Sequence, residues 1–356
     1  MKLDTKNKKW KEFVISDILE IEKSTNKSLS NKTSSNGVND YVGATSKNNG
    51  NVGFVSNKYK NLLKHGECIV FINTGEGSVG EAIYKKNNFI PSNNVTVGRS
   101  KILNEYVGNF IVTINNNQSD KYSYGYIRNE KRLKRDVLIL PTNKKGEPDF
   151  EFMEAYMKQK EKEKLQEYNN YITRRLEKLK DFKNVVPLEE KEWREFKLKS
   201  IFNPTKGDQN KMTDLKKGNY PLVSAKNGNN GLKDFVTKNN KKVYSENTLT
   251  LNNDGDGGAG ISYYQPFEYL LDSHVTSLNP KNQLNKLTLL FISRCITKQR
   301  NKFGHGYSLT NNRLTAFKIM LPITTQNEPD YEYMENYMKQ LEYKKLKEYL
   351  KIKGLN

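Results

Sequence analysis

The sequence predicts a mixed α+β protein built from two tandem homologous domains, each followed by a long helix. Three observations lead to this prediction. An internal repeat covers most of the chain, short β-type stretches alternate with turns rich in glycine and asparagine, and each copy ends in a charged helical segment. We expect the two helices to pair as an antiparallel coiled coil, which would give the molecule pseudo-two-fold symmetry.

The repeat is clearest where each long helix begins. GEPDFEFMEAYMKQ at 146–159 recurs as NEPDYEYMENYMKQ at 327–340, with ten of fourteen positions identical and two exchanging Phe for Tyr. WKEF at 10–13 likewise matches WREF at 193–196. Self-similarity at a nearly fixed offset indicates a tandem duplication. We therefore expect domains at 1–147 and 186–328, and long helices at 148–185 and 329–356.

The elements follow the same order in each copy. The stretches YVGATSKNNGNVGFV and YPLVSAKNGNNGLKDFV predict short strands and turns, and β-type runs follow at ECIVFIN and TLTLN. Helices are expected at about 103–117 and 285–301. A loop and one more strand, VLILP or FKIMLP, then lead into the long helix.

The long helices have favourable starts and apolar stripes. Pro148 and Pro329 preset the backbone φ, and the acidic residues after them face the positive end of the helix dipole. Apolar residues then recur at three- and four-residue steps, from Met153 to Leu179 and from Met334 to Ile352. Such a stripe needs a partner, so we expect the two stripes to pack against each other.

The net charge of +20 at pH 7 indicates a polyanionic partner, chiefly nucleic acid. Lysine supplies most of it, and lysine, asparagine, isoleucine and tyrosine all have A+T-rich codons. Base composition is therefore a second source of the excess, and charge alone does not establish binding to DNA or RNA.

The bulk composition also predicts a cytoplasmic protein. No apolar run approaches the roughly 18 residues of a membrane span, and the charged N-terminal segment lacks the apolar core of a signal peptide. Cys68 and Cys295 are the only cysteines and are expected to be free thiols. The histidines are isolated, so we expect no metal site.

Two enzyme-like patterns occur in the sequence. GEGSVG at 75–80 and GDGGAG at 255–260 match a dinucleotide fingerprint, but β-type sequence follows each where that site needs a helix. The glycines are therefore expected to form turns, and a close approach of the backbone to DNA phosphate is the alternative. Asp330 with Glu342 and Lys344 mimics a nuclease motif, although all three fall on one predicted helix. The sequence contains no [DNS]-P-P-[FYW] amino-methyltransferase motif.

The paired domains, the Leu-Pro turn before each long helix and the phrase PDFEFMEAYMK with its repeat PDYEYMENYMK resemble the specificity subunits of type I restriction–modification systems and their type IIB and IIG relatives. The resemblance covers essentially the whole chain and is strongest to the shorter type IIB subunits. It implies two target-recognition domains that each read one half of a split DNA site, with the helices acting as an antiparallel ruler. The second helix is shorter than the first, so this ruler is expected to be only partly paired.

Candidate DNA contacts lie in Asn/Lys-rich turns and in loops where basic and aromatic residues alternate. Asparagine can pair bidentately with adenine, and Lys or Arg can contact guanine or phosphate. A turn-forming or core-facing role remains the alternative for each residue. The expected contacts are Lys47, Asn48, Asn49, Asn73, Thr74, Lys121, Tyr122, Tyr124, Arg128, Lys226, Asn227, Asn229, Asn253, Arg300, Lys302, His305 and Tyr307.

The resulting hypothesis is a non-catalytic subunit that binds a bipartite, gapped DNA target and directs an enzyme partner to it. The partners would be double-stranded DNA and a methyltransferase, either separate or fused to the nuclease, with no membrane. S-adenosylmethionine and Mg²⁺ would belong to that partner, which would methylate adenine N6 and cleave DNA, and this chain would need no cofactor. A free-standing DNA-binding regulator or decoy and an enzyme in its own right are the alternatives.

Overall fold

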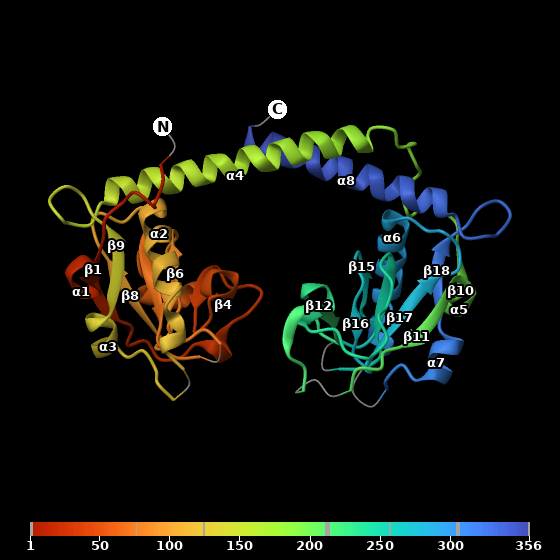
Figure 1. Cartoon of the computed structure of the whole chain (residues 1–356), viewed down its shortest axis with the longest axis horizontal. Coiled ribbons are helices and arrows are strands. Elements are labelled where there is room, and N and C mark those ends of the chain that lie inside the picture. The colour runs from red at the N-terminus through yellow and green to blue at the C-terminus, as the bar shows by residue number, and fades with distance from the viewer. Residues whose placement is uncertain are drawn as a thin grey trace. The chain divides into compact units, whose positions relative to one another are not determined.

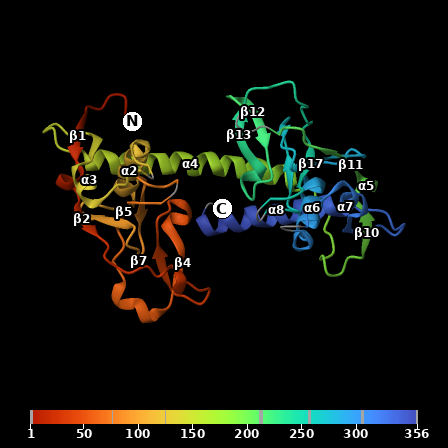
Figure 2. The ribbon, with the colours of Figure 1, turned by 90° about the horizontal axis from the view of Figure 1, so that it is seen from below.

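The computed structural model describes residues 3–75, 77–123, 125–210, 214–255, 258–303 and 307–354. The chain forms two compact units, Met1–Tyr168 and Asn169–Asn356. The border between them falls inside the long helix α4, Phe150–Leu179. Both units mix short strands and helices (Figures 1 and 2), as the sequence predicts.

Unit 1 contains two sheets and a two-stranded ribbon. The four-stranded antiparallel sheet has the order β2 (Glu20–Lys23), β8 (Val95–Arg99), β5 (Cys68–Ile72), β6 (Ala82–Lys85). The three-stranded sheet has the order β4 (Asn51–Val55), β3 (Asn39–Val42), β7 (Ile90–Pro91). The ribbon pairs β1 (Trp10–Val14) with β9 (Val137–Pro141). All five residues of β5 are buried, which explains its uninterrupted apolar sequence.

Three shorter helices complete unit 1: α1 (Ile15–Ile18), α2 (Glu105–Asn116) and α3 (Glu130–Arg135). The α2 helix begins because the Asn104 side chain accepts hydrogen bonds from the first free backbone N–H groups, those of Tyr106 and Val107. Its buried face packs on β6 and joins the main core, together with residues of β5 and β9.

Unit 2 repeats this plan. Its ribbon pairs β10 (Trp193–Lys197) with β18 (Lys318–Pro322). One sheet has the order β11 (Phe202–Lys206), β17 (Val275–Pro280), β14 (Thr248–Asn252), β15 (Ser262–Gln265). The other has the order β13 (Leu232–Val236), β12 (Lys217–Val223), β16 (Leu270–Leu271). The helices are α5 (Leu198–Ile201), α6 (Lys286–Thr297), α7 (Asn311–Ala316) and α8 (Tyr331–Lys353).

The register of the ribbons confirms that the duplication extends to the fold. Trp10 pairs with Pro141 in unit 1, and Trp193 pairs with Pro322 in unit 2. Each tryptophan stacks on a phenylalanine of the neighbouring helix, Phe110 or Phe291, at centroid distances of 6.3 and 6.0 Å. The two copies therefore share their topology and also the packing of their ribbons.

The apolar stripes of the long helices were expected to pack against each other, which is wrong for the residues at the start of each stripe. Met153 is fully buried in the core of unit 1, and Met157 packs against the same core. Met334 is buried in the core of unit 2, whereas Ile352, at the other end of the stripe, is 81% exposed. The start of each stripe therefore packs on the core of its own domain.

Within unit 2, the end of α4 does lie antiparallel to α8 (Figure 1). Arg175 donates two hydrogen bonds to the Glu342 carboxylate, from Nε at 2.6 Å and Nη2 at 2.8 Å. Eight residues on, the Lys183 backbone N–H donates to the Asn336 Oδ1 at 3.0 Å. From Arg175 to Lys183 the residue number rises, whereas the number of the hydrogen-bonded residue on α8 falls from 342 to 336, so the two segments run antiparallel.

In the described part of the chain, every helix is too short or too polar to span a bilayer.

Candidate DNA-binding interface

Three loops meet at one end of unit 1. Ser46 lies within hydrogen-bonding distance of Ser78, with its backbone N and its Oγ 3.3 and 3.4 Å from the Ser78 Oγ. The Arg128 backbone N–H donates to the Asn73 carbonyl at 3.0 Å. These contacts bring together the loops at 43–50, 73–78 and 119–129, from which the sequence-predicted contacts of this copy come.

The equivalent loops meet in unit 2. The Asn252 amide donates to the Lys226 carbonyl at 3.4 Å, and the Leu309 backbone N–H donates to the Asn253 carbonyl at 2.7 Å. Helices α3 and α7 directly follow the third loop of their units. Each lies at the end of its own unit that is remote from its long helix (Figure 1). The fold thus presents the same three loops at the same end of each domain.

Asn-Gly turns form the first loop of each set. Asn48 and Asn49 both have φ 50°, and Asn229 and Asn230 have φ 47° and 52°, a left-handed conformation that asparagine tolerates better than most residues. A side chain from the adjacent sheet anchors each turn. The buried Lys85 donates to the Asn49 carbonyl at 3.5 Å, and the Nε2 of Gln265, the equivalent residue in unit 2, donates to the Asn230 carbonyl at 3.2 Å.

These turns leave their polar side chains at the surface. The exposed predicted residues here are Lys47, Asn48, Asn49, Lys226, Asn227 and Asn229. An anchored backbone turn that presents exposed amide and ammonium groups suits both base-edge and phosphate contacts.

Asn73 and Asn253 have a structural role that the sequence analysis did not predict. Both are buried, at 5% and 6% exposure. The Asn73 Nδ2 donates to the Thr96 Oγ1 at 2.9 Å, and the Asn253 Oδ1 accepts from the Thr276 Oγ1 at 2.8 Å. Each hydrogen bond joins the end of one strand to the neighbouring strand. The two asparagines are therefore structural residues and not the DNA contacts that the sequence predicts. Thr74, next to Asn73, is half-buried.

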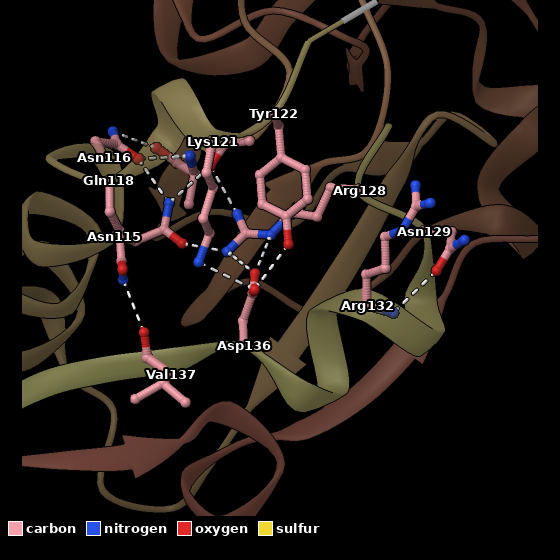
Figure 3. Close-up of polar contacts among 12 residues, drawn as sticks. Asn115, Asn116, Gln118, Lys121, Tyr122, Arg128, Asn129, Arg132, Asp136 and Val137 are labelled. Carbon is pink, nitrogen blue, oxygen red and sulfur yellow. Dashed lines mark hydrogen bonds and ion pairs between the residues drawn. The ribbon is translucent and has the colours of Figure 1, made fainter. Parts of the chain in front are cut away.

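Arg128 was expected to contact DNA, but the structure places its side chain in the core of unit 1. Its side chain is 1% exposed and is fully engaged inside unit 1 (Figure 3). Nε and Nη2 contact the Asp136 carboxylate at 2.8 Å, Nη1 donates to the Gly80 carbonyl at 2.7 Å, and Nη2 donates to the Asn115 Oδ1 at 2.6 Å. Burial lowers the pKa of the Arg128 guanidinium, while Asp136 opposes that change. This arginine therefore cross-links the core and is not available to DNA.

Two more predicted residues belong to this cluster (Figure 3). Tyr122 is 7% exposed, and its hydroxyl donates to the Asp136 carboxylate at 2.7 Å. Burial and the nearby carboxylate raise the pKa of Tyr122. Lys121 is more accessible, with its Nζ 3.1 Å from Asp136. Of the two, only the lysine can reach a ligand without breaking the core.

Unit 2 replaces the buried side chains of this cluster with apolar residues. One offset of 181 residues aligns Asn115, Tyr122, Arg128 and Asp136 with Ile296, Phe303, Leu309 and Phe317. All four replacements belong to or pack against the apolar core, and the Phe303 and Phe317 rings meet edge to face at 5.3 Å. Near them on the same segment, Lys302 is exposed and Arg300 is half-buried.

An arginine stacks on an exposed tyrosine in each unit. The Arg132 guanidinium lies 3.9 Å from the centroid of the Tyr126 ring, and that of Arg313 lies 3.6 Å from the Tyr307 ring. The two rings are 49% and 52% exposed. Each arginine also donates to a nearby backbone carbonyl, at 2.6 and 2.7 Å, which holds its plane over the ring. A flat cationic surface of this kind can contact phosphate or a base.

The family model of the type I restriction modification DNA specificity domain matches the chain twice, at residues 7–170 and 190–353. The chain belongs to that family. The two matches cover the two repeats, so each unit corresponds to one specificity domain.

Two similar proteins support the assignment. The specificity subunit S.BcgI of a type II restriction enzyme from Heyndrickxia coagulans is 31% identical over 236 residues. The match covers 66% of each chain, slightly less than two thirds of that relative's length. The crystal structure of the type I restriction–modification S subunit from M. genitalium aligns with a TM-score of 0.51 at 16% identity, covering 99% of this chain and 93% of that one. This likeness shows that the specificity-domain fold is shared.

Of the two stacked pairs in the specificity domains, only Tyr307 was among the expected contacts, and Tyr126, Arg132 and Arg313 were not. Their repetition at an offset of 181 residues was the signal that could have identified both stacked pairs. Tyr124 and His305 lie outside the described residues.

Residues 77–80 and 258–260 of the two glycine motifs form turns. Strand β6 follows the first motif and β15 follows the second, where a dinucleotide site needs a helix. Gly75 has φ 120°, and a Cβ there would lie 2.6 Å from the Ala44 carbonyl oxygen. Glycine is therefore required because two of the three loops meet at this position. The described residues include no group of three His, Cys, Asp or Glu side chains placed to hold a metal ion.

Proposed function

We propose that this chain is the non-catalytic DNA-specificity subunit of a restriction–modification complex. Each specificity domain reads one half of a bipartite, gapped target in double-stranded DNA. The observation that carries this proposal is the repeated three-loop cluster, which presents exposed Lys and Asn turns and an Arg–Tyr stack in each unit. Side chains at base edges supply specificity, and Lys and Arg at phosphates supply affinity.

The catalytic chemistry resides in a partner. That partner is a methyltransferase, separate or fused to the nuclease, which binds S-adenosylmethionine and Mg²⁺ and acts on adenine N6. The target-recognition domains 1–147 and 186–328 are each followed by a spacer segment, 148–185 and 329–356, and these segments contain the helices α4 and α8. The antiparallel contacts between Arg175 and Glu342 support such a spacer. The complex works in the cytoplasm, where its DNA target lies.

Domain exchange combined with methylation mapping tests this proposal. The chain is co-expressed with the gene products encoded beside it, the complex that forms is purified, and methylated sites are mapped on DNA from a methylation-deficient host. Replacement of residues 1–145 by the matching segment of a relative should change one half-site and leave the other half-site unchanged. The reciprocal exchange of the second domain is the matched control. A single change that alters both half-sites together, or a chain that recruits no methyltransferase, contradicts the proposal.

A further inference from the structure

The turn between β16 and β17 in unit 2 carries a titratable pair at the candidate interface. The His274 Nδ1 lies 2.9 Å from one carboxylate oxygen of Asp254 and 3.0 Å from the other. The Asn253 backbone N–H donates to the His274 carbonyl at 2.9 Å, which places the pair beside the second loop of the set. A hollow of about 570 Å³ opens here, bounded also by Lys226 of the first loop and by Asp272.

Unit 1 lacks this pair although its backbone is the same. The Asn73 N–H donates to the Asn94 carbonyl at 3.0 Å, so Asn94 is the counterpart of His274. Thr74 stands in place of Asp254 at the same offset of 180 residues. Neither replacement changes its charge near neutral pH, so the two domains differ in their response to pH at equivalent positions.

The geometry determines which imidazole atom can reach a ligand. Nδ1–H donates to Asp254, and 61% of the His274 side chain is exposed beside the hollow, so Nε2 is the ring nitrogen that remains for a ligand. Nε2 is a donor when the ring is protonated and an acceptor when the ring is neutral. The hydrogen bond to Asp254 raises the pKa of His274 above its ordinary value of 6.5, and Asp272 raises it further. Burial and Lys206 act in the opposite direction, and Lys226 and Lys233 also face the hollow.

We propose that the Asp254–His274 pair is a protonation-dependent reading element for the half-site bound by unit 2. The Nε2–H of the protonated ring donates to an acceptor atom on a base edge, such as the N7 or O6 of guanine. A base edge suits the pair better than a phosphate does. The His⁺–Asp⁻ pair has no net charge to attract a phosphate, whereas the hydrogen bond from Nε2–H is directional. This inference rests on the proposed function and adds to it a residue-level reader in one half-site.

The pH dependence has a definite sign. Contact requires the protonated ring, so discrimination at this position is strongest at low pH. It is lost as the pH rises through the raised pKa of His274. Unit 1 has no such group at the equivalent position and should read its half-site equally well at both ends of the range.

Selection of bound duplexes from a randomised library tests the proposal with the purified full chain, at about pH 6 and about pH 8.5. The wild-type chain should enrich a bipartite sequence in which one position of one half-site loses its preference at the higher pH. His274→Asn should abolish that preference at both pH values, with a loss of roughly ten- to a hundredfold in discrimination. The double substitution Thr74→Asp with Asn94→His should make the other half-site pH-dependent.

The possible outcomes distinguish failure of the proposed function from failure of the reading element. Failure of the wild-type chain to enrich any bipartite sequence overturns the proposed function. Enrichment of a bipartite sequence that neither pH nor His274→Asn alters overturns the reading element and leaves the function standing. A loss of affinity that is equal for all sequences, with a shallower salt dependence, identifies a phosphate contact and also overturns the reading role.

Discussion

At the scale of single residues, the Arg128 cluster shows how one fold accepts two kinds of core. Arg128 and Asp136 form a buried, fully hydrogen-bonded ion pair in unit 1, and Leu309 and Phe317 occupy the equivalent positions in unit 2. A buried ion pair is roughly balanced between desolvation and attraction, and apolar residues of similar volume often replace it without loss. The two repeats are a natural example of that balance.

This comparison leads to a stability prediction. Arg128→Leu leaves Asp136 buried without its main partner and should lower the free energy of unfolding by about 3–5 kcal/mol. Adding Asp136→Phe, Tyr122→Phe and Asn115→Ile reproduces the apolar set of unit 2 and should recover most of that loss. The urea midpoint of unit 1 provides the measurement. Removal of the exposed Lys134, which pairs with Glu130 on α3, is the control and should have little effect.

At the scale of elements, the end of α4 and the segment after it are held to α8 by a few specific contacts. Arg175 meets Glu342 through a bidentate ion pair, and the Lys183 backbone N–H donates to the Asn336 Oδ1 at 3.0 Å. The hydrogen bond to Glu342 raises the pKa of Arg175, which therefore stays charged. These contacts define the antiparallel alignment of the two segments within unit 2.

A charge exchange tests that alignment. Arg175→Glu and Glu342→Arg should each destabilise unit 2, because like charges then face each other. The double exchange should restore opposite charges, with a coupling free energy of about 1 kcal/mol between partly buried groups. Urea unfolding of the four proteins gives the coupling. Lys345 and Glu348, an exposed pair on α8 alone, serve as the control, and equal coupling for both pairs would argue against the α4–α8 contact.

At the scale of the whole molecule, the net charge of +20 is the dominant physical property. Exposed lysines occur in the loops and also along the long helices, as Lys47 and Lys164 illustrate. Only those that reach DNA phosphates contribute to the salt dependence of binding, because each neutralised phosphate releases its counterions. Salt titration therefore separates the loop lysines from the helix lysines.

We expect the logarithm of the DNA association constant to fall linearly with the logarithm of salt concentration, with several phosphates contributing about −0.9 each to the slope. Replacing Lys47 and Lys226 by alanine should make the slope shallower by about 0.9 for each lysine that contacts a phosphate. Alanine at Lys164 and Lys345 on the helices should leave it unchanged. Fluorescence anisotropy over a range of salt concentrations gives the slope, and an affinity independent of salt would refute a major role for these lysines.

The sequence by itself determined the duplication, the α+β class, the order of elements and the family. All of these depend on local patterns: the repeated phrase at 146–159 and 327–340, the Gly/Asn turns, and the helical spacing after Pro148 and Pro329. Such patterns can be recognised in the sequence because propensity and periodicity act over a few neighbouring residues. The turn geometry of Asn49-Gly50 belongs to the same group.

Tertiary structure alone decided which polar residues are free. Arg128 and Lys121 look alike in the sequence, yet one is buried among Asp136, Asn115 and the Gly80 carbonyl while the other remains accessible. The partners of Met153 and Met334 were equally undetermined, because an apolar stripe specifies burial but not the surface that buries it. Burial and pairing depend on residues distant in the chain, such as the Asn73 carbonyl that receives the Arg128 N–H, and no local pattern encodes them.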